Sequence, residues 1–87
     1  MTNAQRIEQM EQKLKAELQP TVLSVEDESH LHAGHAGARS GKGHFKLTIK
    51  SEHFDGIRVL QRHRFIYSAL GEMMDTEIHA LTIIIVE

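Results

Sequence analysis

The chain has 87 residues, a formal net charge of −2 and no cysteine. This length predicts a single small domain over residues 1–87, without room for separate catalytic and binding domains. The lack of cysteine excludes a disulfide framework and a metal site made only of the chain's own thiolates. The polar start and the lack of a long apolar run predict no signal peptide and no membrane span, so we expect a cytoplasmic protein.

The first predicted element is a helix that ends at Pro20, a residue that cannot continue a helix. Thr2 or Asn3 can cap its start, and Gln5 lies three residues after Thr2, as in a capping box. Its apolar residues recur at helical spacing: Ile7, Met10, Leu14 and Leu18. A short strand over residues 21–26 follows.

A glycine- and histidine-rich loop over residues 27–43 comes next. A loop this long in so small a domain is usually either functional or disordered. It contains Gly34, Gly37, Gly41 and Gly43 together with His30, His32 and His35. Apolar and polar residues alternate in the strand after it, Phe45-Lys46-Leu47-Thr48-Ile49-Lys50. One face of this strand should therefore lie in the core and the other in water.

A turn over residues 51–56, anchored by Phe54, leads into a helical stretch over about residues 57–74. We expect a short helix there that turns into a longer one. The side chains predicted to line its apolar face are Leu60, His63, Tyr67, Leu70 and Met74. The last strand spans residues 79–86 and is apolar on both faces. It should therefore be central in the sheet, or be an edge strand that meets a partner.

The order helix, strand, strand, helix, helix, strand predicts an α+β fold, an α/β sandwich with a three-stranded mixed sheet and helices on one face. The first two strands are most simply antiparallel. If the second and third strands pair, the crossover through the helices makes them parallel. The end of the first strand and the starts of the other two then lie at one edge of the sheet. His44 and His79 start those two strands, and the loop histidines belong to the same edge, so we expect histidines to meet there.

Three motifs give the chain a resemblance to a known family. They are Phe54-Asp55-Gly56, Gln61-Arg62-His63-Arg64-Phe65-Ile66-Tyr67 and Ile78-His79-Ala80-Leu81. With Asp27-Glu28-Ser29 and His44-Phe45, they resemble the BolA family over about residues 4–86. The resemblance implies a fold like the type II KH domain and a non-enzymatic protein. It also implies pairing with a monothiol glutaredoxin to hold a shared [2Fe–2S] cluster, while some family members act as DNA-binding transcriptional regulators.

The resemblance further implies cluster ligands. The histidine that opens the last strand, here His79, would be one ligand. A loop histidine would be the other, His32 by preference, with His35 as its rival. Imidazoles can replace thiolates on one iron of such a cluster, and the remaining thiolates would come from the partner. Because a metal binds deprotonated imidazole, binding should weaken below about pH 6.

Plainer roles stay open for the histidines. The loop histidines can be solvated, His79 can cap its strand, and His30-Leu31-His32 can bind Zn²⁺, Ni²⁺ or Cu²⁺ adventitiously. His44 is less favoured as a ligand. His63 lies on the predicted apolar helix face, so it is more simply a core histidine, and His53 is most simply a solvated turn residue.

Charge is unevenly distributed along the chain. Residues 1–38 carry three basic and six acidic groups, net −3, and residues 65–87 carry four acidic groups, net −4. Residues 39–64 carry seven basic and two acidic groups, net +5, which suggests nucleic acid as one possible partner. The candidate phosphate-contacting residues are Arg58, Arg62, Arg64, Lys46 and Lys50.

Two features weigh against a nucleic-acid site of the KH type. Such a site needs a Gly-x-x-Gly loop between two helices, and the expected junction at residues 56–60 has none. The run Gly34-His35-Ala36-Gly37 fits the pattern but lies between strands. Aromatic residues for base stacking are few, three Phe and one Tyr, and most are at predicted core positions. The plainer alternatives are a solvated basic face, or ion pairs of Arg62 or Arg64 with Asp27, Glu28 or Asp55.

No serine–histidine–aspartate order, phosphate loop or paired carboxylate pattern indicates an enzyme. The sequence therefore predicts a small adaptor of the BolA type, a monomer or weak homodimer when alone, that shares a [2Fe–2S] cluster with a monothiol glutaredoxin. The alternative is a DNA-binding transcriptional regulator of the stress or morphology type, which would use the basic helix surface.

Overall fold

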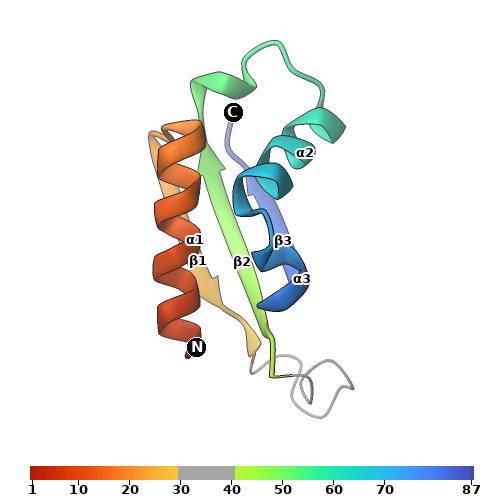
Figure 1. The fold of residues 1–87 in the computed structure, drawn as a ribbon. Coiled ribbons are helices and arrows are strands. Elements are labelled where there is room, and N and C mark those ends of the chain that lie inside the picture. The colour runs from red at the N-terminus through yellow and green to blue at the C-terminus, as the bar shows by residue number, and fades with distance from the viewer. Residues whose placement is uncertain (30–40) are drawn as a thin grey trace.

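The computed structural model of the protein describes residues 1–29 and 41–87. Its elements follow the predicted order and confirm the α+β class. In chain order they are α1 (Asn3–Leu18), β1 (Val22–Asp27), β2 (Gly43–Lys50), the 3-10 helix η3 (Glu52–Phe54), α2 (Val59–Leu70), α3 (Met73–Thr76) and β3 (Ile78–Ile85). The helices α1, α2 and α3 lie on one face of the sheet, as expected (Figure 1).

Helix α1 is stabilised by caps at both ends and by one apolar face. The Thr2 hydroxyl accepts a hydrogen bond from Gln5 N (3.1 Å), and Gln5 Oε1 accepts one from Thr2 N (2.8 Å), so the predicted capping box is present. Gln19 ends the helix in the left-handed region, with φ 41°, directly before Pro20. The buried residues of the helix are Met10, Leu14 and Leu18.

The sheet is mixed, with strand order β1-β2-β3. Strands β1 and β2 are antiparallel, with Val25 opposite Leu47, whereas β2 and β3 are parallel, with Leu47 beside Ile83. Within the described part of the chain, β3 is therefore an edge strand, and the prediction of a central last strand is wrong. The alternative, an edge that meets a partner, stays a prediction.

The apolar character of β3 has two separate causes. Leu81, Ile83 and Ile85 face the helices and pack against the core from the rim of the sheet. Ile84 points to the opposite, open face and is 41% exposed. An edge strand that is apolar on both faces resembles a central strand in sequence, which is why the pattern predicted the wrong position.

The hydrophobic core fills the space between the helices and the sheet. Strand β2 contributes Phe45, Leu47 and Ile49, as the alternation predicted. The other fully buried side chains come from the helices: Met10, Leu14, Ile66 and Leu70. In the described residues, no helix is both long and apolar enough to traverse a bilayer.

Helix α2 buries a different face from the predicted one. Leu70 is fully buried and Met74 packs against the core, but Leu60 is 65% exposed and Tyr67 is 41% exposed. The buried stripe runs instead through Phe65, Ile66, Ala69 and Leu70. The helix carries two apolar stripes, and periodicity alone does not show which of them packs.

The break in the helical stretch also differs from the prediction. The longer helix α2 comes first and ends at Gly71, with φ 57°, and the short helix α3 follows it. The Gly71 N–H donates to the Tyr67 carbonyl (2.9 Å) and closes the last turn of α2. A left-handed C-terminal residue is accessible to glycine at little cost, so Gly71 is the local cause of the break.

Candidate metal-binding site at the start of the parallel strands

Two histidines meet at the end of the sheet where β2 and β3 begin. The ring centroids of His44 and His79 lie 4.9 Å apart, with the ring planes tilted by 56°. Sequence topology predicted that the histidines at the two strand starts lie at one edge of the sheet, and this part of the expectation is confirmed.

A bulge in β3 sets the position of His79. Gly43 is the partner of Ile78, and His44 is the partner of Ala80, so His79 is an extra residue in the register. A bulge of this kind bends the strand and redirects a side chain, and bulges are frequent beside functional sites. The two rings also differ in access, because His44 is only 3% exposed whereas His79 is exposed. His79 is therefore the accessible member of the pair.

The backbone beside the pair leaves no room for a side chain at Gly43. A Cβ atom there would lie 2.4 and 2.5 Å from ring atoms of Phe45 and 2.9 Å from Asn3 Oδ1. Phe45 is 1% exposed and fixed in the core, so its ring cannot easily move aside. Glycine at this position allows β2 to start close to α1 and to place His44 directly after it.

A hydrogen-bond network joins α1 to the start of β2. Asn3 Nδ2 donates to Asp27 Oδ2 (3.0 Å) and to Ser29 Oγ (3.1 Å). The same Ser29 hydroxyl accepts from the backbone N–H of His44 (3.1 Å), and Ser29 N donates to Asp27 Oδ1 (2.8 Å). The network therefore fixes the backbone of His44 from the N-terminal end of α1.

A second contact joins α1 to the start of β3. Arg6 Nε donates to Glu77 Oε1 (2.9 Å), and these side chains are 12% and 22% exposed. The guanidinium also donates to the carbonyl of Gly41, while Gly43 N donates to the Glu77 carbonyl (3.0 Å). The hydrogen bond from Arg6 lowers the pKa of Glu77 below its ordinary value. Arg6 thus ties the residues before β2 to the residue before β3.

These supporting residues were not identified from the sequence. The sequence pattern indicates Asn3 only as a helix cap, and it does not single out Arg6. Their contacts with Asp27 and Glu77 span 24 and 71 residues of sequence, so no local spacing indicates them. The only available signal was the predicted topology, which brings the start of α1 to the same end of the sheet.

The other predicted ligands lie outside the described residues. This applies to His32 and His35, and also to His30. Across residues 1–29 and 41–87, no group of three or more His, Cys, Asp or Glu side chains is placed to hold a metal ion. The described part of the chain thus offers an imidazole pair, which fits a shared metal site only if further ligands come from elsewhere.

The remaining histidines have local roles. His53 Nε2 is 2.7 Å from Gln19 Oε1, at the opposite end of β2 from His44. His63 is half-buried and makes an edge contact with Tyr67, with 6.4 Å between ring centroids. His63 therefore lies beside the exposed face of α2 and not among the core side chains.

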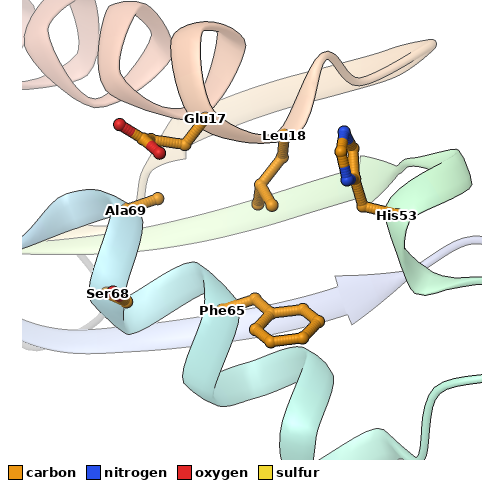
Figure 2. Close-up of a pocket in the computed structure, with 6 residues that line it drawn as sticks. All are labelled: Glu17, Leu18, His53, Phe65, Ser68 and Ala69. Carbon is orange, nitrogen blue, oxygen red and sulfur yellow. The ribbon is translucent and has the colours of Figure 1, made fainter.

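A shallow hollow lies near His53, between the end of α1, η3 and α2 (Figure 2). Its volume is about 230 Å³, and it is lined by Glu17, Leu18, His53, Phe65, Ser68 and Ala69. Figure 2 shows Leu18 between the carboxylate of Glu17 and the imidazole of His53. Small-molecule sites are usually larger, about 300–1,000 Å³, so this hollow is a weaker candidate than the histidine pair.

The predicted basic residues do not form one surface. Lys46 and Lys50 alternate with the core residues of β2 and face the open side of the sheet, whereas α2 lies on the other side. Arg58 and Arg64 are exposed, and no ion pair involves them in the described part of the chain. The two lysines and the arginines therefore do not lie on one surface, and the role of each as a phosphate contact stays a prediction.

Arg62 differs from its two neighbours. Its Nε donates to the Ile57 carbonyl (2.6 Å), and its Nη1 forms an ion pair with Glu87 (2.6 Å). Only 12% of its side chain is exposed. The suggested ion pairs with Asp27, Glu28 or Asp55 are replaced by this contact, so Arg62 connects the start of α2 to the end of β3.

Comparison with known proteins identifies the family. The model of the family described as BolA-like protein matches residues 14–86. The chain belongs to the BolA family. It is 47% identical over 76 residues to the DNA-binding transcriptional regulator BolA of Escherichia coli, covering 87% of this chain and 70% of that BolA protein.

Other BolA relatives share the sequence and the fold. Protein BOLA1, chloroplastic, of Arabidopsis thaliana is 43% identical over 82 residues, which are 91% of this chain but only 51% of that relative. The chain therefore spans about half the length of this relative. The solved BolA domain of SufE1 from Arabidopsis thaliana superposes with a TM-score of 0.79 at 41% identity, covering 92% of this chain and 88% of that one.

Proposed function

We propose that the protein is a non-enzymatic BolA-like adaptor that pairs with a monothiol glutaredoxin to hold a shared [2Fe–2S] cluster. In this proposal His79 supplies one ligand, and His32 or, as its rival, His35 supplies the second. The contact between the His79 and His44 rings at the start of the parallel strands is the observation that carries the proposal. Family membership supports it.

The chemistry of the available donors also supports a shared site. The chain has no cysteine, so any thiolate ligands must come from the partner. Two imidazoles on one iron give a cluster with a higher reduction potential than four thiolates. His44 is buried against His79, so we assign it to orienting the His79 ring and not to binding iron.

Anaerobic reconstitution with a monothiol glutaredoxin, iron and sulfide tests this function. The wild-type chain should give a visible absorption and circular dichroism spectrum that differs from that of the glutaredoxin homodimer. His79→Ala should lose this spectrum, because one ligand is missing. His53→Ala is the matched control, since it removes a histidine from the other end of β2 and should leave the spectrum intact.

The outcomes separate partner binding from cluster ligation. A His79→Ala chain that still binds the glutaredoxin but gives an unchanged spectrum would show that His79 is not a ligand. Comparison of His32→Ala with His35→Ala identifies the loop ligand, because only one of the two should change the spectrum.

Duplex DNA binding is the second candidate function. It is favoured by the similarity to bacterial proteins named DNA-binding transcriptional regulator BolA, 47% and 46% identical, and by two exposed arginines, Arg58 at the N-cap of α2 and Arg64 within it. The proposed contacts are Arg58 and Arg64, whereas Arg62 is held by Glu87. Arginines in such positions would contact phosphates and give salt-dependent binding.

A salt titration of duplex DNA binding tests this second function. An Arg58→Ala/Arg64→Ala double variant should weaken binding and reduce the slope of log K against log salt by about one for each lost phosphate contact. A double variant of Lys46 and Lys50 is the comparison, because these lysines lie on the other face of the sheet. No detectable binding at low salt, or an unchanged slope in the arginine variant, would remove this candidate.

A further inference from the structure

Strand β3 has a hydrogen-bonding edge that is not used within the described part of the chain. The Val86 N–H donates to the Ile49 carbonyl (2.8 Å), so the backbone groups of Val86 point toward β2. Backbone direction alternates along a strand, so Thr82 and Ile84 also point toward β2. The N–H and C=O groups of Leu81, Ile83 and Ile85 then point away from the sheet, where no strand of residues 1–29 or 41–87 pairs with β3.

The side chains of this edge are uncharged and apolar. The segment from Ala80 to Val86 contains no ionisable residue. On the open face, Ile84 is 41% exposed and Val86 is 37% exposed. A long uncharged strand edge is a template for pairing with another strand, and proteins usually block such edges with charges, proline or a covering element.

The opposite edge of the sheet is blocked in this way. Strand β1 ends in Glu26 and Asp27, and Glu28 follows directly. Two β1 edges would bring like charges together, which is unfavourable across a strand pair. A β1 edge on a β3 edge would not close into a dimer and would continue into a chain of molecules. Pairing of β3 with a second β3 is the arrangement that closes without apposing charges.

We propose that β3 pairs with β3 of a second copy of this chain, antiparallel about a two-fold axis, to form a six-stranded sheet in a homodimer. With the axis at Ile83, the outward-pointing backbone groups of Leu81, Ile83 and Ile85 supply the hydrogen bonds. On the open face, Ile84 of each copy then lies opposite Thr82 of the other, an uncharged pair suited to a strand surface. The proposal rests on the backbone edge of β3 and not on the histidine pair or a metal, so it is tested separately from the cluster proposal.

Amide hydrogen exchange of the isolated wild-type chain gives the first test. Measured by NMR between about 10 μM and about 1 mM, the amides of Leu81, Ile83 and Ile85 should become protected as concentration rises. The amides of Thr82 and Ile84 should be protected at every concentration, since they bond to β2. This alternation separates strand pairing from association through another surface. Exchange at Ile83 that does not change with concentration would overturn the proposal.

Sedimentation velocity with two matched variants gives the second test. Val22 and Ile84 are both 41% exposed on the open face, one on each edge strand. Ile84→Glu should raise the dimer dissociation constant at least about tenfold, because two carboxylates enter the pairing. Val22→Glu changes the net charge equally and should leave the constant within about twofold. An equal effect of both variants, or a wild-type monomer at every concentration, would contradict the proposal.

Discussion

At the residue scale, the direction of the His79 ring depends on the bulge that places it outside the regular register. The backbone pairs Gly43 with Ile78 and His44 with Ala80, so His79 projects from the bulge and contacts His44. The contact follows from topology and is therefore predictable from sequence. The bulge is not, because hydrophobic periodicity carries no information about a shift of one residue in one strand.

Gly43 provides a sharp test of how this end of the sheet is built. Gly43→Ala should destabilise the fold by about 1–3 kcal/mol, because the new methyl group would overlap the fixed ring of Phe45. Urea unfolding followed by circular dichroism measures the change. Gly56→Ala would destabilise the fold for a different reason. The backbone at Gly56 has φ 73°, so alanine would be strained there without overlapping another side chain.

NMR spectra of the histidine rings report directly on the shape of the site. In Gly43→Ala, the ring signals of His44 and His79 should shift, whereas those of His53 should not. A variant that is as stable as the wild type, with unshifted His79 signals, would show that the close approach at Gly43 does not exist.

The ion pair of Glu77 with Arg6 predicts a pH dependence of stability. The folded-state pKa of Glu77 is lowered, so its contribution is fully present above its unfolded value of about 4.3 and is lost as pH falls through the folded value. The free energy of unfolding of wild type should therefore exceed that of Glu77→Gln at pH 6. The free energies of unfolding of the wild type and Glu77→Gln should become equal at lower pH, where Glu77 is protonated.

Urea titrations from pH 2 to pH 7 measure this convergence, with Glu8→Gln as the control. Glu8 is exposed on α1 and makes no ion pair in the described part of the chain. The free energy of unfolding of Glu8→Gln should differ from that of the wild type by a constant amount from pH 2 to pH 7. A constant difference between wild type and Glu77→Gln at all pH values would contradict the assigned role of Arg6.

At the element scale, helix α2 shows that sequence periodicity predicts a helix more reliably than it predicts the buried face of that helix. The capped helix α1 and the alternating strand β2 were predictable, since each has one dominant apolar pattern. The succession of helices and strands along the chain was predictable too, although the break between α2 and α3 was not. Helix α2 has two apolar stripes, and β3 is apolar on both faces. In both elements the choice between faces depends on tertiary packing, which no single segment encodes.

Two leucines of α2 test the observed packing. Leu70→Ala should cost about 2–5 kcal/mol because Leu70 is fully buried, whereas Leu60→Ala should cost much less because Leu60 is 65% exposed. Chemical denaturation of both variants gives the comparison. If the two substitutions lowered the free energy of unfolding by similar amounts, Leu60 would lie in the core as the periodicity predicted. That result would contradict the structure.

At the scale of the whole molecule, the two candidate surfaces are well separated. The molecule is elongated, with principal extents of 40 × 20 × 19 Å. The histidine pair lies where β2 and β3 begin, and Arg58 precedes α2 near the other end, where Arg62 contacts Glu87 beyond β3 (Figure 1). A strand of eight residues spans about 25 Å, so one surface does not cover the other directly.

This separation predicts independent effects of substitutions. The Arg58→Ala/Arg64→Ala double variant should leave the affinity for the glutaredoxin and the spectrum of the reconstituted cluster unchanged. Isothermal titration with the glutaredoxin and visible circular dichroism measure the two quantities. A loss of cluster in the double variant would show that α2 belongs to the same interface.

Pulsed EPR of the reduced cluster shows whether His79 binds iron. The chain is labelled with ¹⁵N-histidine, reconstituted with an unlabelled monothiol glutaredoxin and reduced by one electron with dithionite. We expect a strong ¹⁵N hyperfine coupling that is lost in His79→Ala and unchanged in His53→Ala. A cluster without ¹⁵N coupling, or a coupling that persists unaltered in His79→Ala, would contradict the assignment of His79 as a ligand.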